Sequence, residues 1–311
     1  MECSELEVIR KLEDLKDGTP SVVTVGVFDG VHLGHHAIME IVRKESAGLN
    51  ARSVVITFDR NPEEIIHPHK TVPYITTLSQ KLALIGEQGI DLAVVLPLEA
   101  WLIKMPAEEF VKDILYKKLS AVQVVVGTNF VFGKDRTGSV RLLQEMGKQL
   151  GFNVTAVPPV KVGEISVSST AIRGLLADGK IERANKFLGR PFSLDGKVIT
   201  GEGIGQKLGF PTANIQPAEK QIVPGEGVYA ISLVLNGEKW TGVANIGTKP
   251  TVDGKASGVE VHIIGFSGNI YGHQLELMFH HRLRSEVRFS STEALKQQIS
   301  RDVERAAQLV E

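Results

Sequence analysis

Residues 22–35 read VVTVGVFDGVHLGH, and this stretch decides the fold of the first half of the chain. It opens with a short β-branched run, which is the composition of a strand buried on both faces of a sheet. A turn that contains Gly26 and Gly30 follows, and a helix-like pattern begins near His35. A strand that leads through such a turn into a helix predicts a β-α-β unit and a parallel sheet.

The same alternation continues to about residue 185. Further short apolar runs lie at 53–58, 92–98, 122–127 and 154–160, and helix-like stretches lie at 35–46, 78–88, 107–119 and 140–150. Right-handed crossovers between the strands place helices on both faces of the sheet, as a three-layer sandwich. Ligands bind such sheets at the carboxyl ends of the strands, so we expect the functional residues just after each strand.

Turn signals become frequent after residues 189–191, which marks a second domain. Two short helices, broken at Asp178-Gly179, are predicted before this second domain. Within it, Asn236-Gly237 is a strong hairpin signal. Strand-like runs lie at 228–235, 239–245, 259–266 and 274–280 and predict a small antiparallel barrel. A C-terminal helix is predicted by the spacing of Leu295, Ile299, Val303, Ala306 and Val310. We place the boundary near 186–190, which gives domains of residues 1–186 and 187–311.

The composition excludes several classes of protein. Lys and Arg number 35 and Asp and Glu 36, a formal net charge of −1, so no long-range attraction to nucleic acid or to an anionic membrane is expected. Cys3 is the single cysteine, which excludes an intrachain disulfide framework and a cysteine-based zinc site and suits a reducing compartment. The first residues are charged where a signal peptide is apolar, and no apolar run approaches the roughly 20 residues that span a bilayer. We therefore expect a soluble, cytoplasmic protein.

The motif His32-x-Gly34-His35 at the mouth of the predicted helix suits polyphosphate binding. Gly30 and Gly34 allow the backbone to approach a nucleotide closely, and the helix offers unpaired N–H groups at its positive end. His32 and His35, three residues apart, can both donate hydrogen bonds to phosphate oxygens. One alternative is an ordinary strand-to-helix turn with histidines that face the solvent. A metal site is a further alternative, but it leaves the glycines without a purpose; its ligands would be His32, His35, His36 and Glu40.

Residues 26–35 resemble the nucleotidyltransferase signature of the bacterial bifunctional riboflavin kinase/FAD synthetase family. Related His-x-Gly-His loops occur in other adenylyltransferases and in class I aminoacyl-tRNA synthetases, so the loop alone specifies adenylyl transfer better than it specifies flavin. The resemblance implies a Rossmann-like nucleotidyltransferase domain in which His32 and His35 are catalytic. The nucleotide-binding residues that it implies here are Gly26, Phe28, Asp29, Gly30 and Gly34.

Two later segments resemble elements of the same family. Residues 127–134, GTNFVFGK, match its Gly-x-Asp/Asn-Phe-x-Phe-Gly element, where Phe130 and Phe132 either border an aromatic ligand or belong to the core. Residues 168–173, SSTAIR, form a hydroxyl-rich helix start with an arginine one turn along, which suits clamping of phosphates. An ordinary N-cap would explain one serine of this run. The resemblance adds to the nucleotide site Asn129, Ser169, Thr170 and Arg173.

One departure from the family follows the second predicted strand. The family commonly has a Phe-Glu/Asp-Pro-His-Pro-like stretch there, whereas this chain has FDRNP at residues 58–62. Asn61, in place of the histidine, can donate a hydrogen bond to phosphate but cannot carry a proton. A proton-transferring role is therefore not carried over to this position.

A second constellation opens the second domain at residues 201–214, GEGIGQKLGFPTAN. It is neither a Walker A motif nor a dinucleotide-binding glycine motif, but glycines followed by Gly-Phe-Pro-Thr-Ala-Asn resemble the flavokinase signature. Thr212 and Asn214 offer hard oxygen ligands that suit Mg²⁺, and the glycine loop suits a lid over a nucleotide. A turn before a capped strand would explain the glycines alone. The implied nucleotide-binding residues are Gly201, Gly203, Gly205, Thr212 and Asn214, with Phe210 for flavin.

Glu260 lies between Val259 and Val261 on a predicted strand, so its side chain points to the opposite face. A solvent-facing glutamate is the ordinary outcome of this pattern. In the family the matching glutamate is the general base on the riboflavin 5′-hydroxyl, a role that typically contributes about 10²- to 10⁴-fold. The resemblance also suggests Arg284 as a flavin contact, against the alternative of a surface arginine.

The two signatures occur in order, one in each predicted domain, and the resemblance covers nearly the whole chain. They imply an α/β domain followed by a flavokinase-type barrel, and a bifunctional enzyme that uses ATP and Mg²⁺ to convert riboflavin to FMN and then to FAD. Two alternatives stay open: an adenylyltransferase for a pantetheine-like or nicotinate-like phosphate, and a regulator that binds flavin or RNA without catalysis. We assign no role to His67, His69, His262, His273, His280 and His281.

Overall fold

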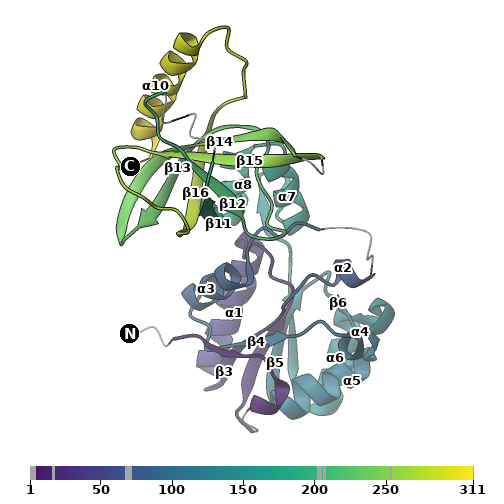
Figure 1. Cartoon of the computed structure of the whole chain (residues 1–311). Helices are drawn as coiled ribbons and strands as arrows, with labels where there is room; N and C mark the ends of the chain where they lie inside the picture. Colours follow the sequence, from purple (N-terminus) through teal and green to yellow (C-terminus); the bar gives the residue numbers. More distant parts are fainter. Residues whose placement is uncertain are drawn as a thin grey trace. The chain divides into compact units, whose positions relative to one another are not determined.

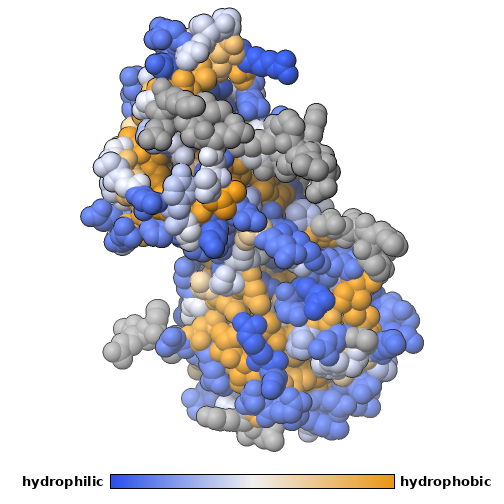
Figure 2. Space-filling model, viewed as in Figure 1, coloured by the Kyte–Doolittle hydropathy of each residue, from blue (hydrophilic) through white to orange (hydrophobic). Residues whose placement is uncertain are grey.

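The computed structural model describes residues 5–15, 18–66, 72–201, 205, 208–251 and 254–310. The chain divides into two compact units, Met1–Val72 with Leu78–Val167, and Pro73–Thr77 with Ser168–Glu311 (Figure 1). Figure 2 shows one face of the molecule, on which hydrophilic residues surround patches of hydrophobic residues on each unit. No helix in the described part of the chain has the length and apolar composition needed to cross a membrane.

The first unit is built on a six-stranded parallel sheet with the strand order β1-β4-β3-β2-β5-β8. Its strands are β1 (Glu7–Ile9), β2 (Ser21–Val25), β3 (Arg52–Phe58), β4 (Leu92–Leu96), β5 (Ala121–Gly127) and β8 (Asn153–Val157). The predicted parallel sheet is confirmed, and the short edge strand β1 is an addition that the sequence analysis missed. The order of the strands reverses between β2 and β5, and a reversal of this kind is where open α/β sheets bind their ligands.

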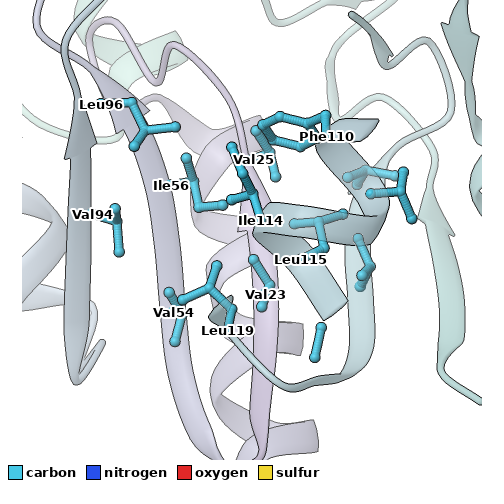
Figure 3. Close-up of a cluster of buried hydrophobic side chains, with 14 of the residues drawn as sticks. Val23, Val25, Val54, Ile56, Val94, Leu96, Phe110, Ile114, Leu115 and Leu119 are labelled. Carbon is cyan, nitrogen blue, oxygen red and sulfur yellow. The ribbon is translucent and has the colours of Figure 1, made fainter. Parts of the chain in front are cut away.

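Two hydrophobic cores lie on opposite faces of this sheet, because successive side chains of a strand point to opposite sides. The helices are α1 (Leu33–Gly48), α2 (Glu63–Ile66), α3 (Leu78–Glu87), α4 (Ala100–Lys104), α5 (Ala107–Glu109), its π-helical continuation η2 (Phe110–Lys118) and α6 (Val140–Leu150). Val22 and Val55 pack with α1 and α3 on one face. On the other face Val23 and Val54 pack with η2 and α6, and Figure 3 shows Ile114 of η2 among these valines. The predicted three-layer sandwich is confirmed.

The second unit is a closed antiparallel barrel with the strand order β11-β12-β15-β14-β13-β16. Its elements are α7 (Ser169–Ala177), α8 (Ile181–Leu188), β11 (Phe192–Ile199), β12 (Ala213–Pro217), β13 (Gly227–Leu235), β14 (Glu238–Thr251), β15 (Gly254–Ile263), β16 (Gln274–Arg284) and α10 (Thr292–Leu309). Ala306 and Val310 are buried against Val228 and Leu283, so α10 packs on the barrel. The predicted barrel and C-terminal helix are both confirmed.

Helices α7 and α8 belong to the same compact unit as the barrel. The side-chain amide of Asn185 in α8 donates to the carbonyl of Phe279 at 2.8 Å and accepts from the N–H of Phe192 at 2.8 Å. The compact unit therefore starts at Ser168, whereas the sequence analysis began the second domain at residue 187. The boundary between functional domains is a separate matter and stays a prediction.

Residues 73–77 also belong to the second unit, which no sequence pattern indicated. Tyr74 exchanges backbone hydrogen bonds with Lys220 and Ile222, both at 2.8 Å. The buried side chain of Gln221 donates to the carbonyls of Ile75 (3.2 Å) and Ser193 (2.9 Å) and accepts from the N–H of Asp195 at 2.9 Å. One glutamine thus joins this segment to the first strand of the barrel.

Replacing this glutamine should destabilise the second unit. Gln221→Met keeps the volume but leaves two buried carbonyls and one N–H without this partner, which costs about 1–3 kcal/mol. Trp240 fluorescence in a Trp101→Phe background reports unfolding of this unit. The exposed Gln216→Met on β12 is the matched control and should change stability by less than about 0.5 kcal/mol. Equal stability of the two variants would contradict the assigned role.

Candidate active sites

The turn after β2 carries the chain into α1 at the reversal of the sheet. Phe28, Gly30 and Val31 have φ angles of 51°, 82° and 35°, which for the β-branched Val31 is a rare conformation. The N–H of Gly26 donates to the carbonyl of Ile56 at 3.0 Å, and the N–H of Val31 donates to the carbonyl of Phe28 at 3.1 Å. Backbone strain of this kind persists only where the surrounding structure fixes it.

His32 and His35 lie at the start of α1 with their rings stacked, 3.6 Å between centroids and 17° between planes. The N–H of His32 donates to Nδ1 of His35 at 3.3 Å. Because Nδ1 accepts, a neutral His35 ring carries its hydrogen on Nε2, which is then its donor nitrogen. A Cβ on Gly34 would lie 3.1 Å from Cε1 of His32, so glycine leaves room for the ring. The structure brings together the two imidazoles that the spacing predicted to act together.

Phe28 supports this histidine pair from the interior. Its ring is buried and meets the His35 ring edge-on, with 5.0 Å between centroids. A Cβ on Gly26 would lie 3.0 Å from the Phe28 ring, so these two residues pack tightly. Contact of either residue with a nucleotide stays a prediction.

Lys81 of α3 is buried beside the same turn, and the sequence analysis did not single it out. Its Nζ donates to the carbonyls of Val27 at 3.2 Å and Phe58 at 2.8 Å. Burial lowers the pKa of Lys81 from 10.5 to about 8, while the charges of Asp29 and Asp59 act in the opposite direction. Asp29, predicted to bind nucleotide, thus faces a buried cation.

The segment after β5 lies on the other side of the reversal in strand order. Asn129 is exposed, directly after the strand. The rings of Phe130 and Phe132 are stacked, 5.3 Å between centroids, and both are half-buried against the core below the sheet. Each of these two rings therefore packs partly against the hydrophobic core, as one of the two predicted alternatives states. Contact between Asn129 and a phosphate or ribose stays a prediction.

The SSTAIR segment starts α7 as its hydroxyl-rich composition predicted. Oγ of Ser168 accepts a hydrogen bond from the N–H of Ala171 at 3.2 Å and caps the helix. Ser169, Thr170 and Arg173 follow in the first turns, in the second compact unit. The histidine pair lies in the first unit, so a nucleotide site that uses both segments stays a prediction.

A row of directly paired residues crosses the barrel and contains Glu260. The paired neighbours are, in order, Ile199, Asn214, Glu260, Asn245, Val228 and Arg284. Direct partners point to the same face, with Cβ atoms about 4.5–5.5 Å apart. Glu260 therefore lies between two asparagines, while Val259 and Val261 are buried on the other face. Asn245 is the last residue of the predicted strand run 239–245, and the register places it beside Glu260.

Gly201 and Gly205 lie close to Asn214 and Thr212, respectively. A Cβ on Gly201 would overlap the Asn214 amide, and a Cβ on Gly205 would overlap the carbonyl of Phe210 and lie 2.8 Å from Oγ1 of Thr212. The hydroxyl and amide oxygens of this cluster are of the hard type that Mg²⁺ prefers, so the donor set fits that ion. Gly203, predicted to bind nucleotide, lies outside the described residues.

Phe210 is held in place by His262, a residue that was given no role. The two rings meet edge-on with 5.6 Å between centroids, and Nδ1–H of His262 donates to the carbonyl of Pro211 at 2.8 Å. His262 stands two residues from Glu260 on β15, and therefore on the same face. Through these contacts His262 joins Phe210 and Pro211 to β15, the strand that carries Glu260. A flavin contact of Phe210 stays a prediction.

Arg284, at the end of the same row, is committed to an ion pair. Its Nε donates to Oδ2 of Asp302 at 2.9 Å, its Nη2 forms an ion pair with the same oxygen at 2.9 Å, and Asp302 of α10 is 5% exposed. The guanidinium also lies 5.6 Å from the centroid of the Phe289 ring. Arg284 is thus half-buried and paired with Asp302, and contact with flavin stays a prediction.

Comparison with known proteins finds two family models along the chain. Residues 14–171 match the family model described as FAD synthetase, and residues 188–310 match the model described as riboflavin kinase. The chain is 40% identical over 307 residues to the bifunctional riboflavin kinase/FMN adenylyltransferase of Pseudomonas fluorescens. The aligned residues cover 98% of each of the two chains. It is 36% identical over 300 residues to the protein of that name from Escherichia coli K12, covering 96% of each.

The chain belongs to the bifunctional riboflavin kinase/FMN adenylyltransferase family. A crystal structure named a macrolide-efflux protein, from Streptococcus pneumoniae, has a TM-score of 0.90 at 27% identity and covers 97% of this chain. The fold is therefore shared over nearly the full length, and efflux is a statement about that protein. The segment that matches the FAD synthetase model ends at residue 171, and the segment that matches the riboflavin kinase model begins at residue 188. The boundary near 186–190 stays a prediction.

Asn61 occupies the position where this family commonly has a histidine. It is buried, and its Oδ1 accepts a hydrogen bond from the N–H of Glu63 at 3.0 Å, at the start of α2. The amide oxygen is therefore used to begin a helical turn. The geometry gives a physical reason for an asparagine here that is independent of catalysis.

The packing of Gly205 yields a prediction for the barrel site. Gly205→Ala forces the loop away from Thr212 and Phe210, and the displacement should lower riboflavin phosphorylation by about 10²-fold. FMN adenylylation assayed with supplied FMN should be unchanged. Gly174→Ala in α7, where an added Cβ meets nothing within 4 Å, is the control for kinase activity. Full kinase activity of Gly205→Ala would show that the loop tolerates displacement.

The pKa of Lys81 predicts a pH dependence of stability. The folded-state pKa of about 8 lies below the unfolded value of 10.5, so between these pH values the unfolded chain binds more protons and stability at this site rises with pH. Lys81→Met removes this dependence. The difference in unfolding free energy between this variant and the wild type should therefore shift by about 3 kcal/mol, in favour of the wild type, from pH 7 to pH 10.5.

The measurement follows Trp101 fluorescence in a Trp240→Phe background, which reports the first unit. Other lysines and tyrosines titrate over the same range, but they cancel in the difference between the two proteins. A pH-independent difference would mean that Lys81 is not desolvated in the folded state.

Proposed function

We propose that this chain catalyses two ATP-dependent steps. The predicted domain of residues 187–311 phosphorylates riboflavin to FMN, and the predicted domain of residues 1–186 transfers an adenylyl group from a second ATP to FMN, which gives FAD and pyrophosphate. One observation carries the proposal: a stacked histidine pair at the sheet reversal and the glutamate row of the barrel occur in one chain, each inside the segment that matches the corresponding family model.

In the kinase step Glu260 is the general base. Its carboxylate accepts the proton of the riboflavin 5′-hydroxyl, the hydroxyl oxygen bonds to the γ-phosphorus of ATP, and the bond from that phosphorus to the leaving ADP breaks. Asn214 and Asn245, on either side in the barrel row, orient the base. Gly201, Gly203 and Gly205 cover the nucleotide. Thr212 and Asn214 hold Mg²⁺, which when bound neutralises charge on the phosphates.

In the adenylyl step a phosphate oxygen of FMN bonds to the α-phosphorus of ATP, and the bond to pyrophosphate breaks. The attacking oxygen is already ionised near neutral pH, so no enzyme base is needed. His32 and His35 donate hydrogen bonds that stabilise the charge on the leaving pyrophosphate, helped by the N-terminal end of the 16-residue α1. The proposed further nucleotide contacts are Gly26, Phe28, Asp29, Gly30, Gly34, Asn129, Ser169, Thr170 and Arg173.

The finer surroundings of the activity are also proposals. Phe210 and Arg284 are proposed to contact the flavin of the kinase site, because Phe210 packs on His262, two residues from Glu260, and Arg284 ends the row that contains Glu260. All proposed partners are small molecules: ATP, riboflavin and FMN, with no nucleic acid and no membrane. The single cysteine suits the reducing conditions of the cytoplasm, where we place the enzyme.

The two steps should separate by substitution. Glu260→Gln should lower FMN formation by about 10²- to 10⁴-fold, because the base is lost, and should leave FAD formation from supplied FMN intact. His35→Gln should do the reverse, because a donor to the leaving group is lost. Chromatography of the products from riboflavin or FMN, with ATP and Mg²⁺, measures both.

The exposed Glu238→Gln on β14 is the control for the glutamate substitution and should keep both activities. Loss of both activities in one folded variant would contradict the division between the two predicted domains. Pyrophosphate release with another organic phosphate but not with FMN would reveal a different adenylyltransferase. Flavin binding without turnover would indicate a regulator.

A further inference from the structure

The side chain of Lys81 stands where the parallel strands of the first unit end. It is 7% exposed, and its Nζ bridges the carbonyl of Val27, just after β2, and that of Phe58, the last residue of β3, at 3.2 and 2.8 Å. Oγ1 of Thr57 donates to the same Val27 carbonyl at 3.1 Å. Two donors from different elements therefore hold one carbonyl, directly before the strained turn.

The surrounding charges show that this lysine is built into the sheet edge. Asp29, in the turn itself, is 3% exposed, and both Asp29 and Asp59 attract the ammonium group. Oδ1 of Asp59 accepts from the N–H of Leu98 at 2.8 Å, which extends the connection beyond β4. Burying an ammonium group costs stability, and an apolar side chain would fill the same space in α3 without that cost. The lysine therefore requires an explanation other than packing.

The turn links this lysine to the histidine pair in a few steps. Val27 precedes Phe28, whose ring meets His35 edge-on, and the turn closes at Val31 directly before His32. Phe28 and Val31 both have positive φ, so the turn relaxes unless its ends are held. A shift of the Val27 carbonyl moves both the ring that supports His35 and the residue that leads into His32.

We propose that Lys81 is a positioning residue for adenylyl transfer. Lys81 fixes the Phe28–Val31 turn and, through it, the stacked rings of His32 and His35. It acts through the two carbonyls and does not touch the substrate. The inference rests on the proposed adenylyl transfer. Residues that position groups used in the transition state affect kcat more than KM, which separates this role from substrate binding.

Lys81→Met is the first test, since methionine is unbranched and of similar length. We expect kcat for FMN adenylylation to fall about 100-fold, with KM for ATP and FMN changed by less than about threefold. Lys81→Arg, which keeps a charged donor, should recover most of the loss. Thr57→Val removes the other donor to the Val27 carbonyl and should reduce kcat in the same direction, by less.

A spectroscopic readout tests positioning without catalysis. Nitrogen NMR of the imidazoles, with His35 assigned by its disappearance in His35→Gln, reports which ring nitrogen carries the hydrogen. In the wild type we expect the Nε2–H form, because Nδ1 accepts from the N–H of His32. In Lys81→Met we expect a mixture of tautomers, and in Lys81→Arg a return towards the wild-type form.

Ile85→Val is the matched structural control, one turn further along α3 and fully buried. It should lower the thermal midpoint of the first unit and leave kcat unchanged. The proposal is overturned if Lys81→Met keeps wild-type kcat and tautomer, if KM rises with kcat unchanged, or if Ile85→Val loses kcat to the same degree. Riboflavin phosphorylation should be intact in every variant, and absence of FMN adenylylation in the wild type itself would refute the proposed function instead.

Discussion

The reversal of strand order between β2 and β5 determines where chemistry can occur in the first unit. On one side of β2 lie β3, β4 and β1, and on its other side lie β5 and β8. The segments that follow β2 and β5 therefore start from neighbouring strands and lead to opposite sides of the sheet order. In open α/β sheets, ligands bind at the carboxyl edge beside such a reversal. The start of α1 lies at this edge and presents both histidines there. A slip of β2 by one residue would send each of its valines to the opposite core and displace this turn.

The barrel achieves the same result by closure. Because β16 pairs with both β11 and β13, every strand has two neighbours and the register cannot slip at an edge. Asn214, Glu260 and Asn245 come from three different strands, and only this register makes them direct neighbours. The apolar residues on the opposite face fix the register, so the core of the barrel also positions the carboxylate.

The sequence predicted those features that depend on local pattern. Strands β2, β3, β4 and β5 are apolar on both faces and were recognisable as short runs, whereas β1 has three residues and too little pattern to read. Lys81 was missed although it stands four residues before the buried Ile85, because burial of a lysine depends on acceptors that come from distant strands. Asn245 and His262 were missed for a related reason: their importance follows from cross-strand neighbours. The assignment of residues 73–77 and 168–188 to the second unit likewise depends on long-range contacts, such as those of Gln221 and Asn185.

The residues proposed for the two sites stand mostly on strands, at helix starts and in glycine-containing turns. Phosphoryl and adenylyl transfer need charge stabilisation and alignment more than they need an enzyme nucleophile, so small displacements matter more than the identity of a single reactive atom. This accounts for the unfavourable features of the first unit, which a stable core alone would not retain. A β-branched residue in a left-handed conformation and a buried ammonium group each cost folding energy, and they lie at opposite ends of one short turn. In the proposed mechanism the strained Phe28–Val31 turn orients His32 and His35, and Lys81 holds the turn in this conformation.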